Sequence, residues 1–302
     1  MKVSVIIPTY GHPDYLAKSI NSVINQTFKD WELIVVDDND PDTASRKQTE
    51  DLLTKMMGID SRIKYIRHDR NRNGAVARNT GFAAAEGEYI SLLDSDDEYM
   101  PMRLEKCLAA MENESDKIAG VYTGCEFRHY GKTYFKSINV LSGNHLVKTL
   151  ACTFGFFTGS NIFVRKRVID DLNGFDPSFL RHQDYEFLVR LFIKYNLKGI
   201  AEILVIKNNE GFNAPNLQKT IEIKKQYLTK YDTVIKSLPK SDQNLIFQRN
   251  YIAIAENALR EGKYQVANSY YHKSNNYGSL TFLDWKRRLL LPFARYVRKF
   301  LN

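Results

Sequence analysis

Residues 86–97 read Glu86-Gly87-Glu88-Tyr89-Ile90-Ser91-Leu92-Leu93-Asp94-Ser95-Asp96-Asp97, an apolar segment that runs directly into three carboxylates. The apolar part, bounded by Gly87 and by charge, predicts a short buried strand. The three carboxylates repel one another unless a cation lies among them, and carboxylate oxygens suit Mg²⁺ or Mn²⁺. We therefore expect Asp94 and Asp96 to bind a divalent metal; a solvated acidic turn is the alternative.

Strands and helices alternate on both sides of this stretch. Apolar and β-branched runs predict strands at residues 2–7, 32–36, 63–66 and 88–93, and helical spacing predicts helices at 13–24 and 74–85. The alternation predicts an α/β fold with a mostly parallel, doubly wound sheet and helices on both faces. Ligands of such sheets bind beyond the carboxyl ends of the strands. Three of these ends carry polar residues, so we expect one site formed by Pro8-Thr9-Tyr10, Asp37-Asp38 and Asp94-Ser95-Asp96.

Five motifs in this order and spacing resemble family 2 glycosyltransferases. They are Val3-Ser-Val-Ile-Ile-Pro-Thr-Tyr10, Val35-Val-Asp-Asp38, the segment from Asn71 through Gly74 to Ala77-Arg78-Asn79, Gly87-Glu-Tyr-Ile90, and Leu93-Asp-Ser-Asp-Asp97. The resemblance covers about two thirds of the chain, from Lys2 to about Asn208. It implies the GT-A (Rossmann-like) fold, a nucleotide-diphosphate sugar as donor, and inversion at the anomeric carbon.

The resemblance also implies roles for individual residues. Pro8 and Tyr10 are expected at the nucleobase, and Asp38 is expected to accept a hydrogen bond from uracil or ribose. Asn71 and Arg78 are expected to contact the nucleotide, although a structural ion pair explains Arg78 equally well. In the Asp-x-Asp element, Asp94 and Ser95 would bind the donor, and Asp96 with Asp94 would bind Mn²⁺ or Mg²⁺.

The catalytic base is expected at Asp184. The family shows a Gly-Phe-Asp turn followed by an acidic pair, and here Asn173-Gly174-Phe175-Asp176 precedes His182-Gln183-Asp184, with Gln183 in place of the usual Glu. Leu188, Leu191 and Phe192 form an apolar helical face just after Asp184, which predicts Asp184 in the first turn of a helix. There the helix dipole would keep its carboxylate ionised. The alternative is a helix N-cap.

The positive charge of this chain belongs to its C-terminal part. The formal net charge is +8, and residues 217–302 alone carry 16 Lys and Arg against 6 Asp and Glu. This part has helical periodicity throughout, so we expect a GT-A domain at 1–214 and a helical extension at 215–302. Residues 285–302 combine six cations with Trp285, Leu289, Phe293, Tyr296, Val297 and Phe300, which predicts an amphipathic helix on an anionic membrane surface. The alternative is a terminal helix that packs on the protein with a solvated basic face.

The composition of the chain indicates the cellular compartment in which the protein is expected. The three cysteines, Cys107, Cys125 and Cys152, form no disulfide or zinc pattern, which fits a reducing compartment. No secretory signal and no membrane-spanning stretch is expected. We therefore expect a cytoplasmic protein that is peripheral on the cytoplasmic face of the plasma membrane.

The expected function is an inverting glycosyltransferase that moves a sugar from a UDP-sugar to a hydroxyl of a saccharide or lipid-linked acceptor in surface polysaccharide synthesis. One alternative is a sugar-phosphate nucleotidyltransferase, which would need a Gly-rich basic loop after the first strand; Pro8-Thr9-Tyr10-Gly11-His12 is not one. Another is an inactive membrane-binding protein, which the presence of Asp38, Asp94, Asp96 and Asp184 argues against. No nucleic acid is expected as a partner, because the basic stripe is terminal and backed by apolar residues.

Overall fold

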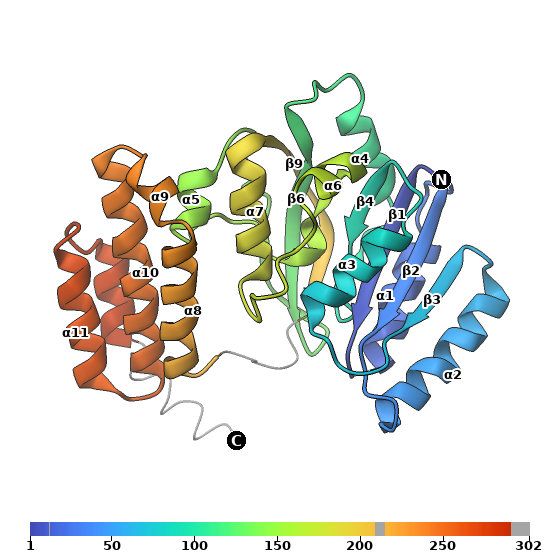
Figure 1. Cartoon of the computed structure of the whole chain (residues 1–302), viewed down its shortest axis with the longest axis horizontal. Coiled ribbons are helices and arrows are strands. Elements are labelled where there is room, and N and C mark those ends of the chain that lie inside the picture. The colour runs from blue at the N-terminus through green and yellow to red at the C-terminus, as the bar shows by residue number, and fades with distance from the viewer. Residues whose placement is uncertain (12, 209–214, 291–302) are drawn as a thin grey trace. The chain divides into compact units, whose positions relative to one another are not determined.

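The computed structural model describes residues 1–11, 13–208 and 215–290. The chain divides into two compact units. The first comprises Met1–Asn144 with Gly155–Phe212, and the second His145–Phe154 with Asn213–Asn302 (Figure 1). The predicted tail residues Phe293, Tyr296, Val297 and Phe300 lie outside the described residues.

The first unit is built on a nine-stranded sheet in the order β3-β2-β1-β4-β8-β6-β9-β5, with β7 paired to β6 outside that path. The strands are β1 (Val3–Thr9), β2 (Trp31–Asp37), β3 (Ile63–Arg67), β4 (Tyr89–Leu92), β5 (Glu98–Tyr99), β6 (Ile118–His129), β7 (Lys132–Ser137), β8 (Phe163–Arg165) and β9 (Asn196–Asn208). The helices of this unit are α1 (Pro13–Ile24), α2 (Ala44–Ile59), α3 (Gly74–Ala84), α4 (Arg103–Met111), the 3₁₀ turn η1 (Gly159–Asn161), α6 (Lys166–Asp171) and α7 (Gln183–Lys194).

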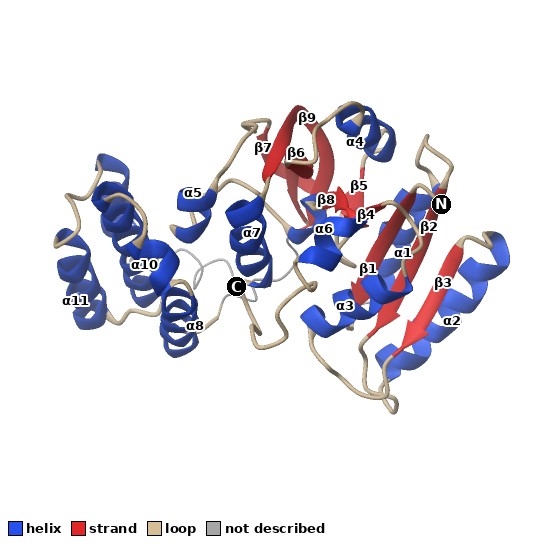
Figure 2. Cartoon of the chain, turned by 45° about the horizontal axis from the view of Figure 1, so that its top comes forward, coloured by secondary structure: helices blue, strands red, loops and turns tan. Residues whose placement is uncertain are grey.

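One half of the sheet is parallel and the other half is mixed. β1 lies between β2 and β4, and all three run parallel, as does β3 beside β2. β8 is antiparallel to both β4 and β6, whereas β6 and β9 are parallel. The predicted α/β fold with parallel strands is therefore confirmed, and the four neighbouring parallel strands come from the N-terminal part of the chain (Figure 2).

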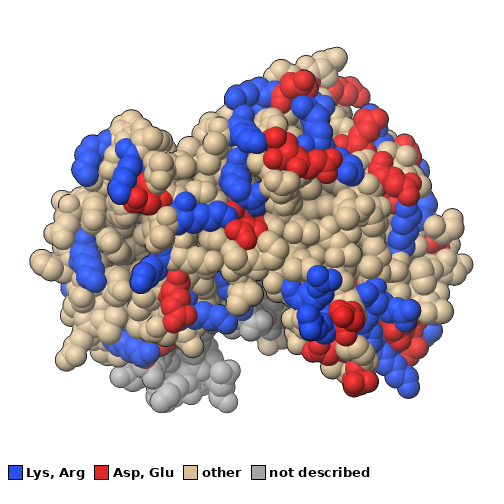
Figure 3. Space-filling view, in the orientation of Figure 1, with Lys and Arg blue, Asp and Glu red and all other residues tan. Residues whose placement is uncertain are grey.

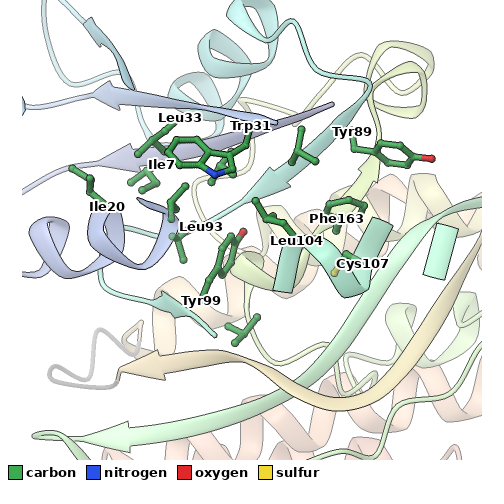
Figure 4. Close-up of a cluster of buried hydrophobic side chains, with 14 of the residues drawn as sticks. Ile7, Ile20, Trp31, Leu33, Tyr89, Leu93, Tyr99, Leu104, Cys107 and Phe163 are labelled. Carbon is green, nitrogen blue, oxygen red and sulfur yellow. The ribbon is translucent and has the colours of Figure 1, made fainter. Parts of the chain in front are cut away.

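Helices cover both faces of the parallel strands because successive side chains of β1 point to opposite sides. Val5 and Ile7 join a core cluster that includes Leu16 and Ile20 of α1 (Figure 4). Ile6 points the other way, where its side chain meets Gly81 of α3; a Cβ on Gly81 would lie 2.4 Å from Ile6 Cγ2. Gly81 thus permits α3 to approach the strand closely.

The second unit is helical. It contains α5 (Leu146–Leu150), α8 (Leu217–Lys230), α9 (Asp232–Lys236), α10 (Lys240–Arg260) and α11 (Tyr264–Asn275), and a further helix covers residues 282–290. Its core is a cluster of apolar residues from α8, α10 and α11. The short segment 145–154 belongs to this unit: Tyr227 Oη donates to the carbonyl of Thr149 (2.9 Å), and Asn250 Nδ2 donates to that of Leu150 (2.9 Å).

Two features of the described residues bear on partners. None of the helices they form has the length and apolarity needed to cross a bilayer. On the face seen in Figure 3, Lys and Arg side chains of the first unit lie among Asp and Glu side chains instead of gathering into one basic surface.

Candidate active site

The carboxyl ends of the central parallel strands meet at one edge of the sheet, as the sequence predicts. Thr9 at the end of β1 pairs in register with Asp37 at the end of β2, and Ile6 pairs with Leu92 at the end of β4. The polar residues that follow these strands therefore lie along the same edge.

Asp94, Asp96 and Asp97, which follow β4, form what we call the acidic tip. An ion pair joins this tip to helix α3. Arg78 Nη2 donates to Asp94 Oδ1 over 2.7 Å, and Arg78 Nη1 donates to Gln183 Oε1 over 2.9 Å. Burial by itself raises the pKa of Asp94, but Arg78 and Lys207 outweigh it and hold the pKa below its ordinary value. The structural ion pair expected as one alternative for Arg78 is therefore present, and it places Arg78 between the acidic tip and the first turn of α7.

Asp97 is the buried centre of the tip. Its Oδ2 accepts from Ser160 Oγ (2.6 Å) and Thr158 Oγ1 (2.9 Å), and its Oδ1 accepts from the backbone N–H of Asn208 (3.2 Å). Ser160 Oγ in turn accepts from the N–H of Asp94 (2.9 Å). Burial raises the pKa of Asp97 to about 7; Lys207 opposes that shift, and Asp96 and Asp94 add to it. These bonds tie the tip to η1 and to the end of β9.

Lys207 brings a cation to the acidic tip that the sequence analysis did not identify. Its Nζ lies 4.0 Å from Asp97 Oδ2 and 3.4 Å from Thr158 Oγ1. The carboxylates of Asp97, Asp94 and Asp96 overcome the effect of burial and raise the pKa of Lys207. The tip thus receives part of its counter-charge from Arg78 and Lys207, so charge repulsion alone does not require a metal there.

The carboxylates present fit a metal that shares its ligands with a substrate. Among the described residues no group of three or more His, Cys, Asp or Glu side chains is arranged to hold a metal ion. Mg²⁺ and Mn²⁺ that act on nucleotides need only one or two carboxylates together with phosphate oxygens. Asp96 is exposed, and Asp94 Oδ1 is bonded to Arg78 while its Oδ2 faces Thr158 Oγ1 at 3.4 Å. This donor set suits an ion bound jointly with a diphosphate.

Asp184 lies in the first turn of α7, as predicted, but its environment differs from the expectation. The N-cap of α7 is His182, so Asp184 is not the cap. Asp184 Oδ1 accepts from the N–H of Tyr185 over 2.9 Å. Burial nevertheless raises the pKa of Asp184, and neither that hydrogen bond nor Arg78 fully offsets the rise. Desolvation therefore outweighs the helix terminus in its effect on this pKa.

A cleft brings three of the predicted residues together. Its volume is about 320 Å³, and its lining includes Arg78, Asp94 and Asp184, with Gly74, Gly159 and Gln183 beside them. Arg78 and Asp94 come from the α3 and β4 side, and Asp184 comes from α7, more than 85 residues later in the sequence. The carboxylate of Asp184, the guanidinium of Arg78 and the carboxylate of Asp94 therefore face one cleft.

Gln183 offers a test of the base through the pH dependence of transfer. A base must be deprotonated, so the rate should fall as the pH drops through the raised pKa of Asp184, above the ordinary value of 3.8. Gln183→Glu adds a carboxylate next to Asp184, and a like charge raises a carboxyl pKa further. We expect the acidic limb of the kcat/KM profile to move to higher pH. An unmoved limb in this variant would argue against Asp184 as the titrating base.

The residues expected at the nucleobase lie at the same sheet edge but do not line that cleft. Pro8 is buried within β1, whereas Tyr10, just beyond the strand, has 61% of its surface exposed. Asn71 is exposed, and its Nδ2 donates to the carbonyl of Asp38 over 3.2 Å. Ser95 is partly buried, and its carbonyl accepts from Ser19 Oγ (2.9 Å). Their roles in donor binding stay predictions.

Asp38 is held by partners that the sequence did not reveal. It is 3% exposed, and its Oδ1 lies 2.7 Å from His68 Nδ1 and accepts from the N–H of Arg72 over 2.8 Å. His68 Nε2 lies 2.9 Å from Thr80 Oγ1 of α3. Both contacts use the same oxygen, which leaves Oδ2 of Asp38 without a partner among the described residues. This is the oxygen that the predicted contact with uracil or ribose would use.

The Gly-Phe-Asp turn is clamped to α3 by Asn79. Asn79 Nδ2 donates to the carbonyl of Phe175, and Asn79 Oδ1 accepts from the N–H of Phe175, both over 2.8 Å. Gly174 has a φ of +63°, and a Cβ there would lie 2.4 Å from Asn79 Oδ1. The turn therefore needs glycine for both conformation and space, and it holds the chain that leads to Asp184.

Gly174→Ala is expected to lower the free energy of unfolding by about 1–3 kcal/mol, because it forces a strained backbone against Asn79. Urea denaturation followed by circular dichroism measures this. Gly58→Ala is the matched control: Gly58 lies in α2, nothing stands within 4 Å of an added Cβ, and alanine favours a helix. Equal stability of the Gly174→Ala protein and the wild type would contradict the clamp.

The aromatic residues Phe154, Phe156 and Phe157, which come shortly before η1, pack against other side chains. Phe154 and Phe156 are 5% and 2% exposed, and Phe156 packs on Tyr122 with ring centroids 5.9 Å apart. Phe157 contacts Phe127 edge-on at 5.8 Å. Phe154 and Phe156 therefore serve as core residues.

Known proteins are similar in sequence to this chain. Residues 4–172 match the model of glycosyl transferase family 2. An uncharacterised glycosyltransferase of Methanocaldococcus jannaschii is 31% identical over 251 residues, which cover 77% of this chain and 78% of that protein. The UDP-Glc:alpha-D-GlcNAc-diphosphoundecaprenol beta-1,3-glucosyltransferase WfgD of Escherichia coli is 29% identical over 255 residues, covering 83% of this chain and 92% of that protein.

Solved structures share the fold. The mannosyltransferase PcManGT from Pyrobaculum calidifontis, solved with GDP-Man and Mn²⁺, superposes with a TM-score of 0.59 at 14% identity, covering 98% of this chain and 80% of that protein. Because the family model spans more than half of the chain and its motifs fall at the strand ends described above, the chain belongs to glycosyl transferase family 2 and is a glycosyltransferase of the GT-A fold.

Proposed function

We propose that this protein is an inverting glycosyltransferase that moves a sugar from a nucleotide-diphosphate donor to a hydroxyl of a saccharide or lipid-linked acceptor. The observation that carries the proposal is the cleft that Asp184 shares with Arg78 and Asp94. A base alone serves many reactions, but a base that faces a cation-lined, carboxylate-tipped strand end suits a substrate that carries a diphosphate.

Asp184 acts as the general base. A sugar hydroxyl is a weak nucleophile at neutral pH, so its proton must move to an acceptor as its oxygen attacks the anomeric carbon. Burial raises the pKa of Asp184, which strengthens its carboxylate as a proton acceptor. One attack, with one base, on the face opposite the leaving diphosphate inverts the configuration.

The leaving diphosphate gains negative charge, which the protein must stabilise. Arg78 already bridges Asp94 and Gln183 at the cleft, so its guanidinium is held in place before the substrate arrives. A bound Mn²⁺ or Mg²⁺ on Asp96 and Asp94 would neutralise phosphate oxygens. Metal dependence, like the Asp-x-Asp role itself, is part of the proposal.

UDP is the proposed nucleotide. The name of the Escherichia coli relative includes UDP-Glc, and that relative covers most of this chain. The Pyrobaculum calidifontis enzyme, in contrast, was solved with GDP-Man, and it shares only the fold with this chain. The relative with the higher sequence identity therefore weighs more.

The proposed acceptor belongs to surface polysaccharide synthesis, and a lipid-linked acceptor agrees with a membrane-facing C-terminus. Within helix 282–290, Asp284 and Arg288 face the second unit: Asp284 Oδ1 accepts from Arg249 (2.8 Å), and Arg288 donates to Asn268 (3.0 Å). Phe282 and Leu289 are 86% and 66% exposed. The helix thus docks through polar residues and leaves large apolar side chains outside, beside the cations at 286–288.

We therefore propose that residues 285–302, preceded by Phe282, bind an anionic membrane surface on the cytoplasmic face. Phe282→Ser with Leu289→Ser removes two of the apolar side chains and should weaken sedimentation with phosphatidylglycerol vesicles. Ile59→Ser, which removes a 72% exposed apolar side chain from α2, should not change it. Undiminished sedimentation of the double variant would contradict the membrane role.

We propose residues 1–214 as the catalytic domain and 215–302 as the helical extension, with segment 145–154 packed into the extension's core.

A panel of UDP-, GDP-, CMP- and dTDP-linked sugars, incubated with the purified protein and Mn²⁺, tests the proposed donor. Slow release of UDP from one sugar donor, lost when EDTA is added, is the expected result. Release of another nucleotide diphosphate would change the proposed donor and leave the proposed transferase activity unchanged. Absence of release across the panel, together with no thermal shift with any nucleotide, would overturn the function proposed here.

A further inference from the structure

Lys207 is built into the acidic tip and not merely near it. It is the penultimate residue of β9, and its backbone pairs in register with Phe127 of β6. The next residue, Asn208, donates from Nδ2 to the carbonyl of Asp96 (2.9 Å) and to Glu98 Oε1 (3.1 Å), and its N–H donates to Asp97. These bonds fix the end of β9 against the tip, so the ammonium of Lys207 has a defined position.

The ammonium of Lys207 has the position and exposure to compete with an incoming cation. Its Nζ is 3.4 Å from Thr158 Oγ1 and 4.0 Å from Asp97 Oδ2, and a quarter of its side chain is exposed. Asp94, Asp96 and Asp97 are all close enough to act on it electrostatically. Asp94 is paired with Arg78, and Lys207 brings a second cation to the tip beside Asp97.

A fixed positive charge beside a metal site has a predictable effect. It repels a divalent cation, and it attracts the phosphate oxygens of a nucleotide. When the diphosphate binds, it brings negative charge that offsets Lys207 and supplies further ligands for the metal. Lys207 therefore lowers the affinity for the metal when no nucleotide is bound, and it lowers that affinity less when the nucleotide is present.

We propose that Lys207 makes binding of the divalent metal at Asp94 and Asp96 depend on the donor diphosphate. The lysine supplies counter-charge to the tip in the protein without ligands and thereby lowers its affinity for the metal ion alone. Metal and nucleotide bind as a pair, with reciprocal coupling between them. Lys207 is thus a positioning residue that orders the ligands, and this inference rests on the metal dependence proposed above.

The test measures the affinity of the full chain for Mn²⁺ by electron paramagnetic resonance, with and without UDP. Without nucleotide, Lys207→Met should bind Mn²⁺ at least about tenfold more tightly than wild type, because one nearby positive charge is gone. Lys207→Arg should behave as wild type. Lys198→Met, which removes a cation from the other end of β9 where it pairs with Glu114, is the matched control and should not change Mn²⁺ affinity.

UDP should strengthen Mn²⁺ binding in wild type, and by a smaller factor in Lys207→Met. Should Lys207→Met destabilise the fold in thermal unfolding, Lys207→Gln keeps a polar head and tests the same charge. The proposal is overturned if, without nucleotide, Lys207→Met and Lys207→Gln both bind Mn²⁺ no more tightly than wild type. It is also overturned if neither wild type nor any of the variants binds Mn²⁺. Because the decisive comparison needs neither a sugar donor nor turnover, its failure is distinct from a failure of the glycosyl-transfer proposal, which the donor panel reports.

Discussion

Asp184→Asn is expected to lower the rate of sugar transfer by about 10²–10⁴-fold, the usual contribution of a general base. Asparagine keeps the size of the side chain and can still accept from the N–H of Tyr185, but it cannot take a proton. Arg78 and Asp94 are untouched, so nucleotide binding should stay as in wild type. The loss should therefore appear in kcat and not in the dissociation constant of the nucleotide.

The first turn of α7 offers Asp184 no replacement as the base. Gln183, the residue before Asp184, lacks a carboxylate, and the other acid of the first turn, Glu186, is buried and paired with Arg190, so neither can replace the base. Steady-state kinetics with the donor identified by the panel, together with nucleotide affinity from calorimetry, separates the two effects. Asp170→Asn on α6, an exposed acid paired with Lys166, is the control and should transfer sugar at the wild-type rate. A transfer rate in Asp184→Asn within tenfold of wild type would mean that another group takes the proton.

Asp96→Ala should reduce transfer by about 10²–10³-fold, the range found when one electrostatic stabiliser of a transition state is removed. Asp96 is exposed at the tip, and its carboxylate is the part of the proposed metal site that Arg78 does not hold. Its loss should also abolish the dependence of the remaining activity on Mn²⁺. Asp97, which is fully buried and bonded to Thr158 and Ser160, is a poor substitute ligand.

Asp42→Ala removes an exposed carboxylate that follows β2 and is the control for Asp96→Ala. Transfer rates are measured against Mn²⁺ concentration for the wild type and both variants. Wild-type activity and unchanged Mn²⁺ dependence in Asp96→Ala would show that the metal, if used, binds elsewhere. Loss of activity in Asp42→Ala as well would point to a general effect of negative charge at this edge of the sheet.

The sequence predicted the parallel half of the sheet because its strands are continuous apolar runs that end at polar residues. β1 and β2 are buried along their whole lengths, so their hydrophobic pattern is unambiguous. The strand at β9 was not predicted. Its exposure changes along its length, from half-buried at Asn196 to buried near Val205, which obscures the pattern.

Missing β9 also meant missing Lys207. A signal was present, since Ile203-Leu-Val-Ile206 passes directly into Lys207-Asn208, the same transition from apolar strand to polar tip that marks Asp94. What the sequence lacked was the pairing of β9 with β6 and β5, which brings residue 207 beside residue 97 across 110 positions of the chain. Long-range pairing of this kind is invisible to local periodicity.

The position of Asp184 followed from helical periodicity, whereas its protonation did not. Periodicity fixed the first turn of α7 because Leu188, Leu191 and Phe192 repeat on one face. The sign of the pKa shift depends on how the rest of the fold buries the carboxylate and on charges brought to it from distant positions, such as Arg78 and Asp94. Local sequence reports the helix dipole but not desolvation.

The most direct test of the central claim, single displacement with Asp184 as base, is the anomeric configuration of the released sugar. Proton NMR during slow hydrolysis of an α-linked nucleotide sugar should show the β anomer first, before mutarotation, and Asp184→Asn should release sugar no faster than buffer. Appearance of the α anomer first would contradict a single displacement, and undiminished release by Asp184→Asn would contradict the role of that carboxylate.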